Sequence, residues 1–236
     1  MTTNPPPDQL PTALPAAQTS EDAAKRSRNL GLAVVVSFVI VCIALTVIAQ
    51  LAKREHYPSG YKPMAFEAAA QSLGIEPVAE WQPTEGDGFS VALPARLQVL
   101  DDAQFQMMVS GASGDVQGTI RVLAIDTQNT SFGRSVMISA IPTTQSMTAS
   151  QFVSGTAGEF KKGGYTIKDV TSYRAGDRRM GRLIYEGTTL FGHKTGVQIA
   201  TIHDNTIWVV TGTVQSWELD VWVPMFEAIA TTLELN

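Results

Sequence analysis

Residues 165–214 read YTIKDVTSYRAGDRRMGRLIYEGTTLFGHKTGVQIATIHDNTIWVVTGTV, and the pattern of this stretch decides the fold. Runs rich in β-branched and aromatic residues, which are typical of strands, are interrupted at 175–177, 192–196 and 204–205. The glycine, aspartate and asparagine residues at these interruptions favour hairpin turns, which join neighbouring antiparallel strands. The stretch therefore predicts a meander of four antiparallel strands.

Further short strands are expected before the meander, because apolar residues alternate there and clusters of Gly, Asp, Asn and Ser separate the runs. These four or five strands are expected at 88–94, 96–100, 104–111, 118–126 and 134–142. Residues 78–88, VAEWQPTEGDG, are interpreted as a loop that leads into the domain.

The segment between the two groups of strands predicts a helix. Thr148 and Gln151 are spaced as in a capping box, in which the two side chains satisfy free backbone N–H groups of the first turn. Apolar residues follow, and two glycines at 163–164 end the helix.

A second helix is expected near the C-terminus, with Pro224 tolerated near its start. Its apolar side chains recur at helical spacing, at Phe226, Ile229, Ala230 and Leu233. We expect this stripe to lie on the sheet, with Glu227 and Thr231 on the opposite, solvated face. No later element is expected to hold the helix in place.

Residues 30–51 carry no charge and would span roughly 33 Å as a helix, close to the apolar core of a bilayer at about 30 Å. This run is longer than that of a cleavable signal and follows a polar leader. We therefore expect a retained membrane anchor. The alternative is cleavage before Gln50, where Val47 and Ala49 are small. Cys42, the only cysteine, lies inside the run and is interpreted as a lipid-facing or helix-packing thiol.

The charges around this run set its expected orientation. Lys25, Arg26 and Arg28 precede it and Lys53 and Arg54 follow it, so the positive-inside bias points the N-terminus to the cytoplasm. A domain-sized segment follows the run. We expect a single-pass protein of the cell membrane whose C-terminal domain is extracytoplasmic.

The predicted fold class is α+β, an antiparallel sheet flanked by helices and preceded by one transmembrane helix. The expected parts are a disordered cytoplasmic tail at 1–29, a transmembrane helix at 30–51, a stalk with a short helix at 52–87, and the α+β domain at 88–236.

The formal net charge of −5 belongs to the part after the predicted span. A nucleic-acid-binding protein would be expected to carry a basic face, so nucleic acid is not an expected partner. With one cysteine the chain cannot form an intramolecular disulfide, and the outer domain must depend on its hydrophobic core.

Patterns that would indicate catalysis or metal binding were not found. The three histidines, His56, His193 and His203, do not converge in the sequence, and no nucleophile motif is present. Two pairs of neighbouring carboxylates, Asp101 with Asp102 and Glu218 with Asp220, are interpreted as turn and helix-start residues. We expect no enzyme activity, no cofactor and no metal.

Four arginines flank one predicted hairpin turn in this acidic domain, namely Arg174, Arg178, Arg179 and Arg182. Arg178 and Arg182 share a strand face, so an anionic partner such as a lipid headgroup or an acidic protein could dock there. If this interpretation holds, exchange of both Arg178 and Arg182 for Glu should leave the thermal stability of the outer domain nearly unchanged. The alternative is a solvated strand face whose charges oppose strand addition.

The order of motifs resembles that of PsbP-like domains, a group that includes LpqN-type envelope proteins. The motifs are FSVALP, VMISAIP, a helix, RLIYEG, IWVVTGTV and PMFEAIATTLEL, and together they cover residues 88–235. The resemblance implies an antiparallel sheet with helices packed on it, and no catalytic machinery. No metal site is carried over, because no matching motif is present.

Two classes of function follow from this reading. The first is a non-enzymatic, membrane-anchored interaction or assembly module, an accessory to other membrane or envelope proteins. The alternative is a carrier that binds a small ligand or a lipid in a cleft between sheet and helices.

Overall fold

The structure is a computed structural model that describes residues 57–109, 119–128, 134–189 and 192–236. The predicted tail at 1–29 and the predicted span at 30–51 lie outside the described residues. Among the helices that are described, none is both long and apolar enough to cross a bilayer.

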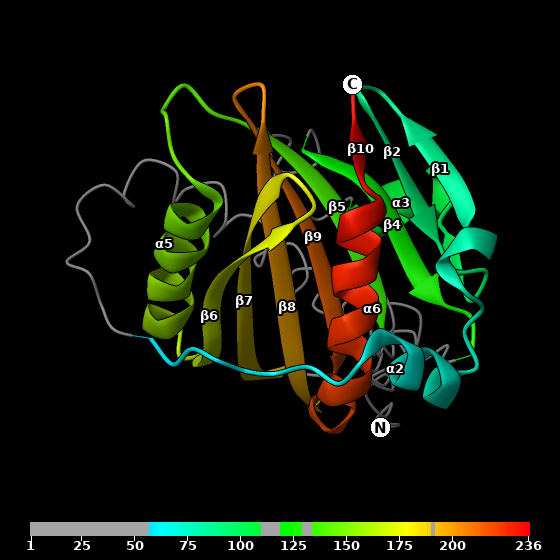
Figure 1. Cartoon of the computed structure of the whole chain (residues 1–236), viewed down its shortest axis with the longest axis horizontal. Coiled ribbons are helices and arrows are strands. Elements are labelled where there is room, and N and C mark those ends of the chain that lie inside the picture. Colours follow the sequence, from blue (N-terminus) through cyan, green and yellow to red (C-terminus); the bar gives the residue numbers. More distant parts are fainter. Residues whose placement is uncertain (1–56, 110–118, 129–133, 190–191) are drawn as a thin grey trace, which may run out of the picture.

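The core of the domain is a seven-stranded sheet in which every pair of neighbours is antiparallel (Figure 1). Its spatial order is β3 (Leu97–Val99), β4 (Ile120–Asp126), β5 (Ser135–Pro142), β9 (Thr206–Gln215), β8 (Gly192–His203), β7 (Arg178–Thr189) and β6 (Thr166–Ala175). The predicted four-stranded meander is confirmed as β6 to β9. The predicted α+β class, with an antiparallel sheet flanked by helices, is also confirmed.

Two of the three predicted meander turns are confirmed, at 176–177 and at 204–205. Asp204 and Asn205 have φ values of 44° and 58°, as a tight hairpin turn requires. The turn predicted at 192–196 is wrong, because β8 already begins at Gly192. Gly196 lies inside the strand, where the ring of Tyr185 occupies the space that a Cβ would need. This glycine therefore reflects close packing rather than a turn.

Two long helices pack on opposite faces of the sheet. α5 (Ala149–Lys162) packs on the face that includes Leu183 and Tyr185, while α6 (Leu219–Thr232) packs on the face that includes Ile184. In Figure 1, α5 lies beside β6, and α6 lies between the meander and the β1–β2 hairpin. The expected capping box is present at the start of α5. The predicted stripe of α6 is buried, with every one of its four residues at most 2% exposed.

A second, three-stranded sheet has the order β1 (Gln82–Gly86), β2 (Phe89–Leu93) and β10 (Glu234–Leu235). The loop predicted at 78–88 is therefore wrong for most of its length. It contains β1 and a short 3₁₀ helix, η1 (Val78–Glu80). β10 pairs with β2, so the end of α6 is held by a strand that sequence reasoning did not predict.

The strand predicted at 104–111 is wrong, because helix α3 (Asp102–Val109) occupies this region. Asp101 and Gln104 explain the difference. The Asp101 carboxylate accepts from the Gln104 N–H at 2.8 Å, and the Gln104 side chain accepts from the Asp101 N–H at 3.2 Å. These reciprocal bonds form the start of a helix and outweigh the short alternation of apolar residues.

The described part of the expected stalk, residues 57–87, is packed onto the domain. The short helix predicted in the stalk is α2 (Phe66–Leu73), which ends at Gly74 in the left-handed conformation. Ala69 and Trp81 are buried in the same core as α6. The packed body therefore starts well before residue 88.

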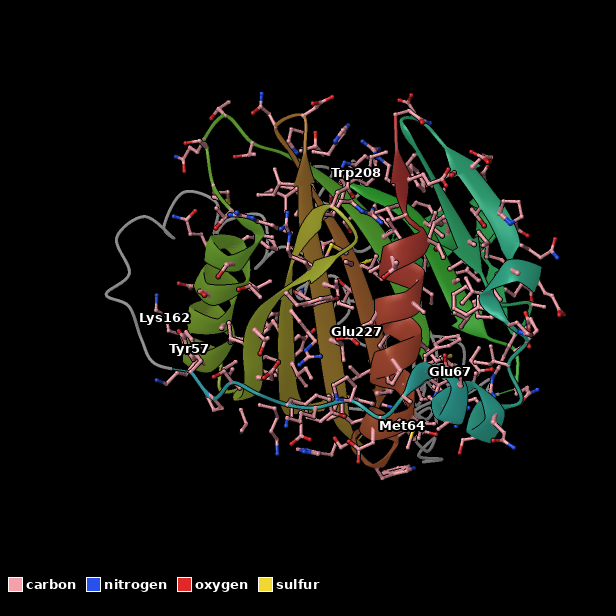
Figure 2. All side chains as sticks on the ribbon, viewed as in Figure 1. Tyr57, Met64, Glu67, Lys162, Trp208 and Glu227 are labelled. Carbon is pink, nitrogen blue, oxygen red and sulfur yellow. The ribbon has the colours of Figure 1, made fainter. Side chains whose placement is uncertain are left out.

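Phe226→Ala tests the packing of α6, since Phe226 is fully buried and lies against Gly212. Loss of a buried Phe typically costs about 3–5 kcal/mol, which corresponds to roughly 6–20 °C in Tm for a domain of this size. Thermal unfolding of the full chain in detergent measures the change. Glu67→Ala, at an exposed position of α2, is the control and should melt like the wild type (Figure 2). An unchanged Tm for Phe226→Ala would contradict the packing described here.

Candidate functional site

The four predicted arginines divide between the two faces of the sheet. Arg178 and Arg182 share a face, as predicted, and this is the face that α6 covers. Arg174 and Arg179 lie on the other side, next to the start of α5. The two pairs consequently have different environments and different partners.

Arg182 is 4% exposed and is the centre of a buried network. Its guanidinium donates to the Asp169 carboxylate at 2.9 and 3.0 Å, to the Glu227 carboxylate at 2.5 Å and to the Tyr61 carbonyl at 2.8 Å. It also lies over the Tyr61 ring, at 5.4 Å from the centroid. Arg182 therefore joins β7, β6, α6 and the N-terminal segment.

This network requires three corrections to the sequence-based expectations. Because α6 and the segment before α2 cover this face, Arg182 is not available to an external partner. Exchange of Arg182 for Glu would bury a carboxylate beside Asp169 and Glu227, so the expectation of unchanged stability is wrong. Glu227 itself is paired with Arg182 rather than left in solvent.

Arg178 has a structural role at the other end of α6. Its guanidinium donates to the carbonyl of Thr231 at 2.5 Å and to the carbonyl of Leu233. α6 has no basic residue in its own last turn. Arg178 therefore supplies from β7 the positive charge that stabilises the C-terminus of a helix.

Of the four predicted arginines, Arg174 and Arg179 are the two that are exposed. They are direct cross-strand partners in β6 and β7. Within the described part of the chain, neither guanidinium has an acidic partner. Like charges directly opposite one another destabilise a sheet, so an external anion between them would relieve that repulsion. We call these two residues the arginine pair.

The arginine pair borders an open hollow of about 300 Å³. The hollow is lined by residues from the start of α5, from β6 and from β7, namely Thr148, Ala149, Ser150, Ser172, Tyr173, Arg174, Arg179 and Met180. The first turn of α5 contributes the positive end of a helix dipole, and Ser150 and Ser172 contribute hydroxyl groups. Every charged side chain in the lining is an arginine, so the chemistry of the hollow suits an anion.

A second charged cluster lies near the start of α6 and was not foreseen. Asp126 is almost completely buried and accepts from Arg96 at 2.8 and 2.9 Å and from Arg134 at 2.7 Å. Arg134 also pairs with Glu218, and both guanidiniums lie over the Trp222 ring at about 5.5 Å. The cluster joins residues far apart in the chain, so no local sequence signal could have revealed it.

The carboxylate pairs considered in the sequence have separate structural partners. Glu218 binds Arg134, Asp220 accepts from the Tyr61 hydroxyl at 2.6 Å, and Asp101 caps α3. Among the described residues there is no group of three or more side chains that could hold a metal ion.

The two described histidines lie at opposite ends of β8. His193 lies 3.6 Å from Glu186, and His203 lies 3.4 Å from Asp204 in the tight turn before β9. The third histidine, His56, lies outside the described residues.

Comparison with solved structures identifies proteins with a similar fold. A cyanobacterial PsbP (CyanoP) from Synechocystis is 17% identical with a TM-score of 0.47, over 68% of this chain and 95% of that protein. LpqN from Mycobacterium tuberculosis, involved in cell envelope biogenesis, is 12% identical with a TM-score of 0.44, over 75% and 99%. Both kinds of protein named by the sequence resemblance are thus among the similar structures. These likenesses concern the fold, and no site or partner is transferred from them.

Comparisons of the sequence find no counterpart. No family model matches the chain, and no curated protein matches it either.

From the ion pairs of Asp126 we predict that the stability of the domain decreases at low pH. Burial favours a higher pKa of its carboxyl group, but the bonds from Arg96, Arg134 and the Gln128 N–H outweigh burial and hold the pKa below its ordinary value. A depressed pKa contributes stability that is complete above the unfolded value of about 3.9 and is lost as the pH falls toward the folded value.

We expect Asp126→Asn to cost about 3–5 kcal/mol at pH 7, because it leaves two arginines without their buried partner. The difference from the wild type should shrink as the pH falls below about 4. Denaturant unfolding at several pH values between 7 and 3 measures it, with the exposed Asp87→Asn as control. A difference that stays constant over this range would show that ionised Asp126 is not its source.

Proposed function

We propose that the chain is a membrane-anchored, extracytoplasmic accessory module that binds an acidic partner protein through the arginine pair. The observation that carries this proposal is the position of Arg174 and Arg179. They are exposed, directly opposite each other, and without an acidic partner in the described residues. Two guanidiniums of this kind can each bind a carboxylate through parallel hydrogen bonds.

The net charge of the chain supports attraction of an acidic partner to one site rather than to the whole surface. The formal net charge is −5, so an acidic partner would be repelled by most of the surface and drawn to the few places where positive charge is unpaired. The hollow beside the arginine pair is open and can admit a side chain from such a partner.

The alternative function, a carrier of a small ligand or lipid, would need an apolar cleft that encloses most of the ligand. The hollow at the arginine pair is lined by serine, threonine and arginine as well as by apolar groups, so it fits a charged group better than an acyl chain. A ligand retained through purification would favour the carrier.

The anchor is tested by washing membranes with alkaline carbonate. We expect full-length protein in the pellet, because 30–51 is long enough to span the apolar core. Recovery of a soluble form that begins at Gln50 would contradict the anchor and would identify the stretch as a cleaved signal.

The arginine pair is tested by the double variant Arg174→Glu, Arg179→Glu in the full chain. We expect proteins that co-purify with the wild type in mild detergent to be reduced at least tenfold, because the exchange converts attraction into repulsion. Wild-type recovery should also fall as salt is raised. Quantitative mass spectrometry of the purified complexes measures both effects.

Arg121→Glu, at an exposed position of β4, is the matched control with the same chemical change. It should retain the partners, and the Tm of the double variant should stay close to that of the wild type. Equal recovery with the double variant and the control would show that the arginine pair is only a solvated part of the sheet.

A further inference from the structure

Trp217 differs from the other tryptophans of the chain. Its side chain is 78% exposed, whereas Trp81, Trp208 and Trp222 are 5%, 6% and 1% exposed. Trp217 lies in a short 3₁₀ helix, η2 (Ser216–Glu218), which joins β9 to α6. An indole ring in this position exposes a large apolar surface to the surroundings of the protein.

The position of Trp217 is at the opposite end of the sheet from the arginine pair. Gly181, two residues from Arg179, lies in one cross-strand row with Ala200 and Val209. β9 continues for six residues beyond Val209 to Gln215, which corresponds to roughly 20 Å along an extended strand, and Trp217 follows in η2.

Met64 adds a second exposed apolar side chain at the end where Trp217 lies. It is 40% exposed, and Figure 2 places it beside the start of α6. The Tyr61 hydroxyl donates to Asp220 in the first turn of α6, so the chain before α2 is fixed next to η2. The two exposed side chains therefore belong to one end of the domain.

The N-terminal segment of the domain is held rigidly near this end. Residues 57–63, which we call the strap, run across the lower part of the sheet in Figure 1. The Pro58 carbonyl accepts from the Val170 N–H at 2.9 Å, and the Tyr61 N–H donates to Asp169 at 3.1 Å. The predicted span ends six residues before Tyr57, a distance that an extended chain covers in at most about 20 Å.

We propose that the end of the domain bearing Trp217 and Met64 lies against the membrane that holds the anchor, with the Trp217 ring in the interfacial layer. This inference rests on the proposed anchor. The six residues from the end of the predicted span to Tyr57 keep the start of the strap within about 20 Å of the bilayer, and tryptophan favours the boundary between water and lipid. The arginine pair then faces away from the bilayer, where an acidic protein rather than a lipid headgroup can reach it.

Tryptophan fluorescence of the full chain in vesicles tests this placement. The vesicles contain phosphatidylcholine and phosphatidylglycerol, with a fraction of the phosphatidylcholine brominated in its acyl chains. We expect the brominated lipid to quench part of the emission and aqueous iodide to leave that part unquenched. Trp217→Ser should remove the quenched part, while Trp208→Phe, at a buried position, should keep it.

Two results would overturn the placement. Quenching of Trp217 by iodide without quenching by brominated lipid would show that the ring faces water. Protection from both quenchers would show that a protein surface covers it. Carbonate washing of the same vesicles separates the two proposals: protein that stays in the pellet without quenching contradicts only the placement, whereas protein that is washed off contradicts the anchor.

Discussion

The buried ion pair between Arg182 and Asp169 is the interaction on which the arrangement of the domain depends. Each partner is almost completely removed from water, and the pair is completed by Glu227 from α6 and by the backbone of Tyr61. A buried charge that loses its partner is strongly destabilising, so these four groups constrain one another. Two strands, one helix and the strap are thus locked in a single relative position.

Because of this network, the two faces of the β6–β7 hairpin have different environments. On the face of α6, Arg178 and Arg182 serve the interior of the domain. On the face of α5, the arginine pair is exposed at the surface. Arg178 and Arg179 are adjacent in β7, and their side chains lie on different faces because adjacent strand residues point to opposite sides of the sheet. An exposed charged surface and a structural clamp can therefore occupy the same few residues of sequence.

The elements with long, regular sequence patterns were predicted correctly. The meander, α5 with its cap, and the buried stripe of α6 followed from periodicity and turn chemistry. β1 and β10 could not be predicted, because such short strands exist through pairing with β2 rather than through their own composition. α3 was missed because its start depends on one pair of reciprocal hydrogen bonds.

The candidate site was predicted only in part, for the same physical reason. The sequence identified the four arginines, but their division into two pairs depends on which face α6 covers. The cluster around Asp126 joins the end of β4, the residues just before β3 and β5, and the start of α6, through contacts between residues distant in sequence. The exposure of Trp217 is likewise a property of the packed structure, because a tryptophan beside a helix start reads equally well as a core residue.

The strap has a mechanical consequence. It crosses the strands of the sheet and is fastened to them first by the Pro58–Val170 backbone bond and then by the Asp169 and Arg182 contacts, so tension in the chain from the N-terminal side reaches the backbone bond before this ionic clamp. The hydrogen bonds of the strands lie behind it and carry load only after the clamp has opened. Detachment of this leading segment from the domain would thus be resisted by one backbone bond and a few charge-assisted bonds, and their strength sets the force at which it begins.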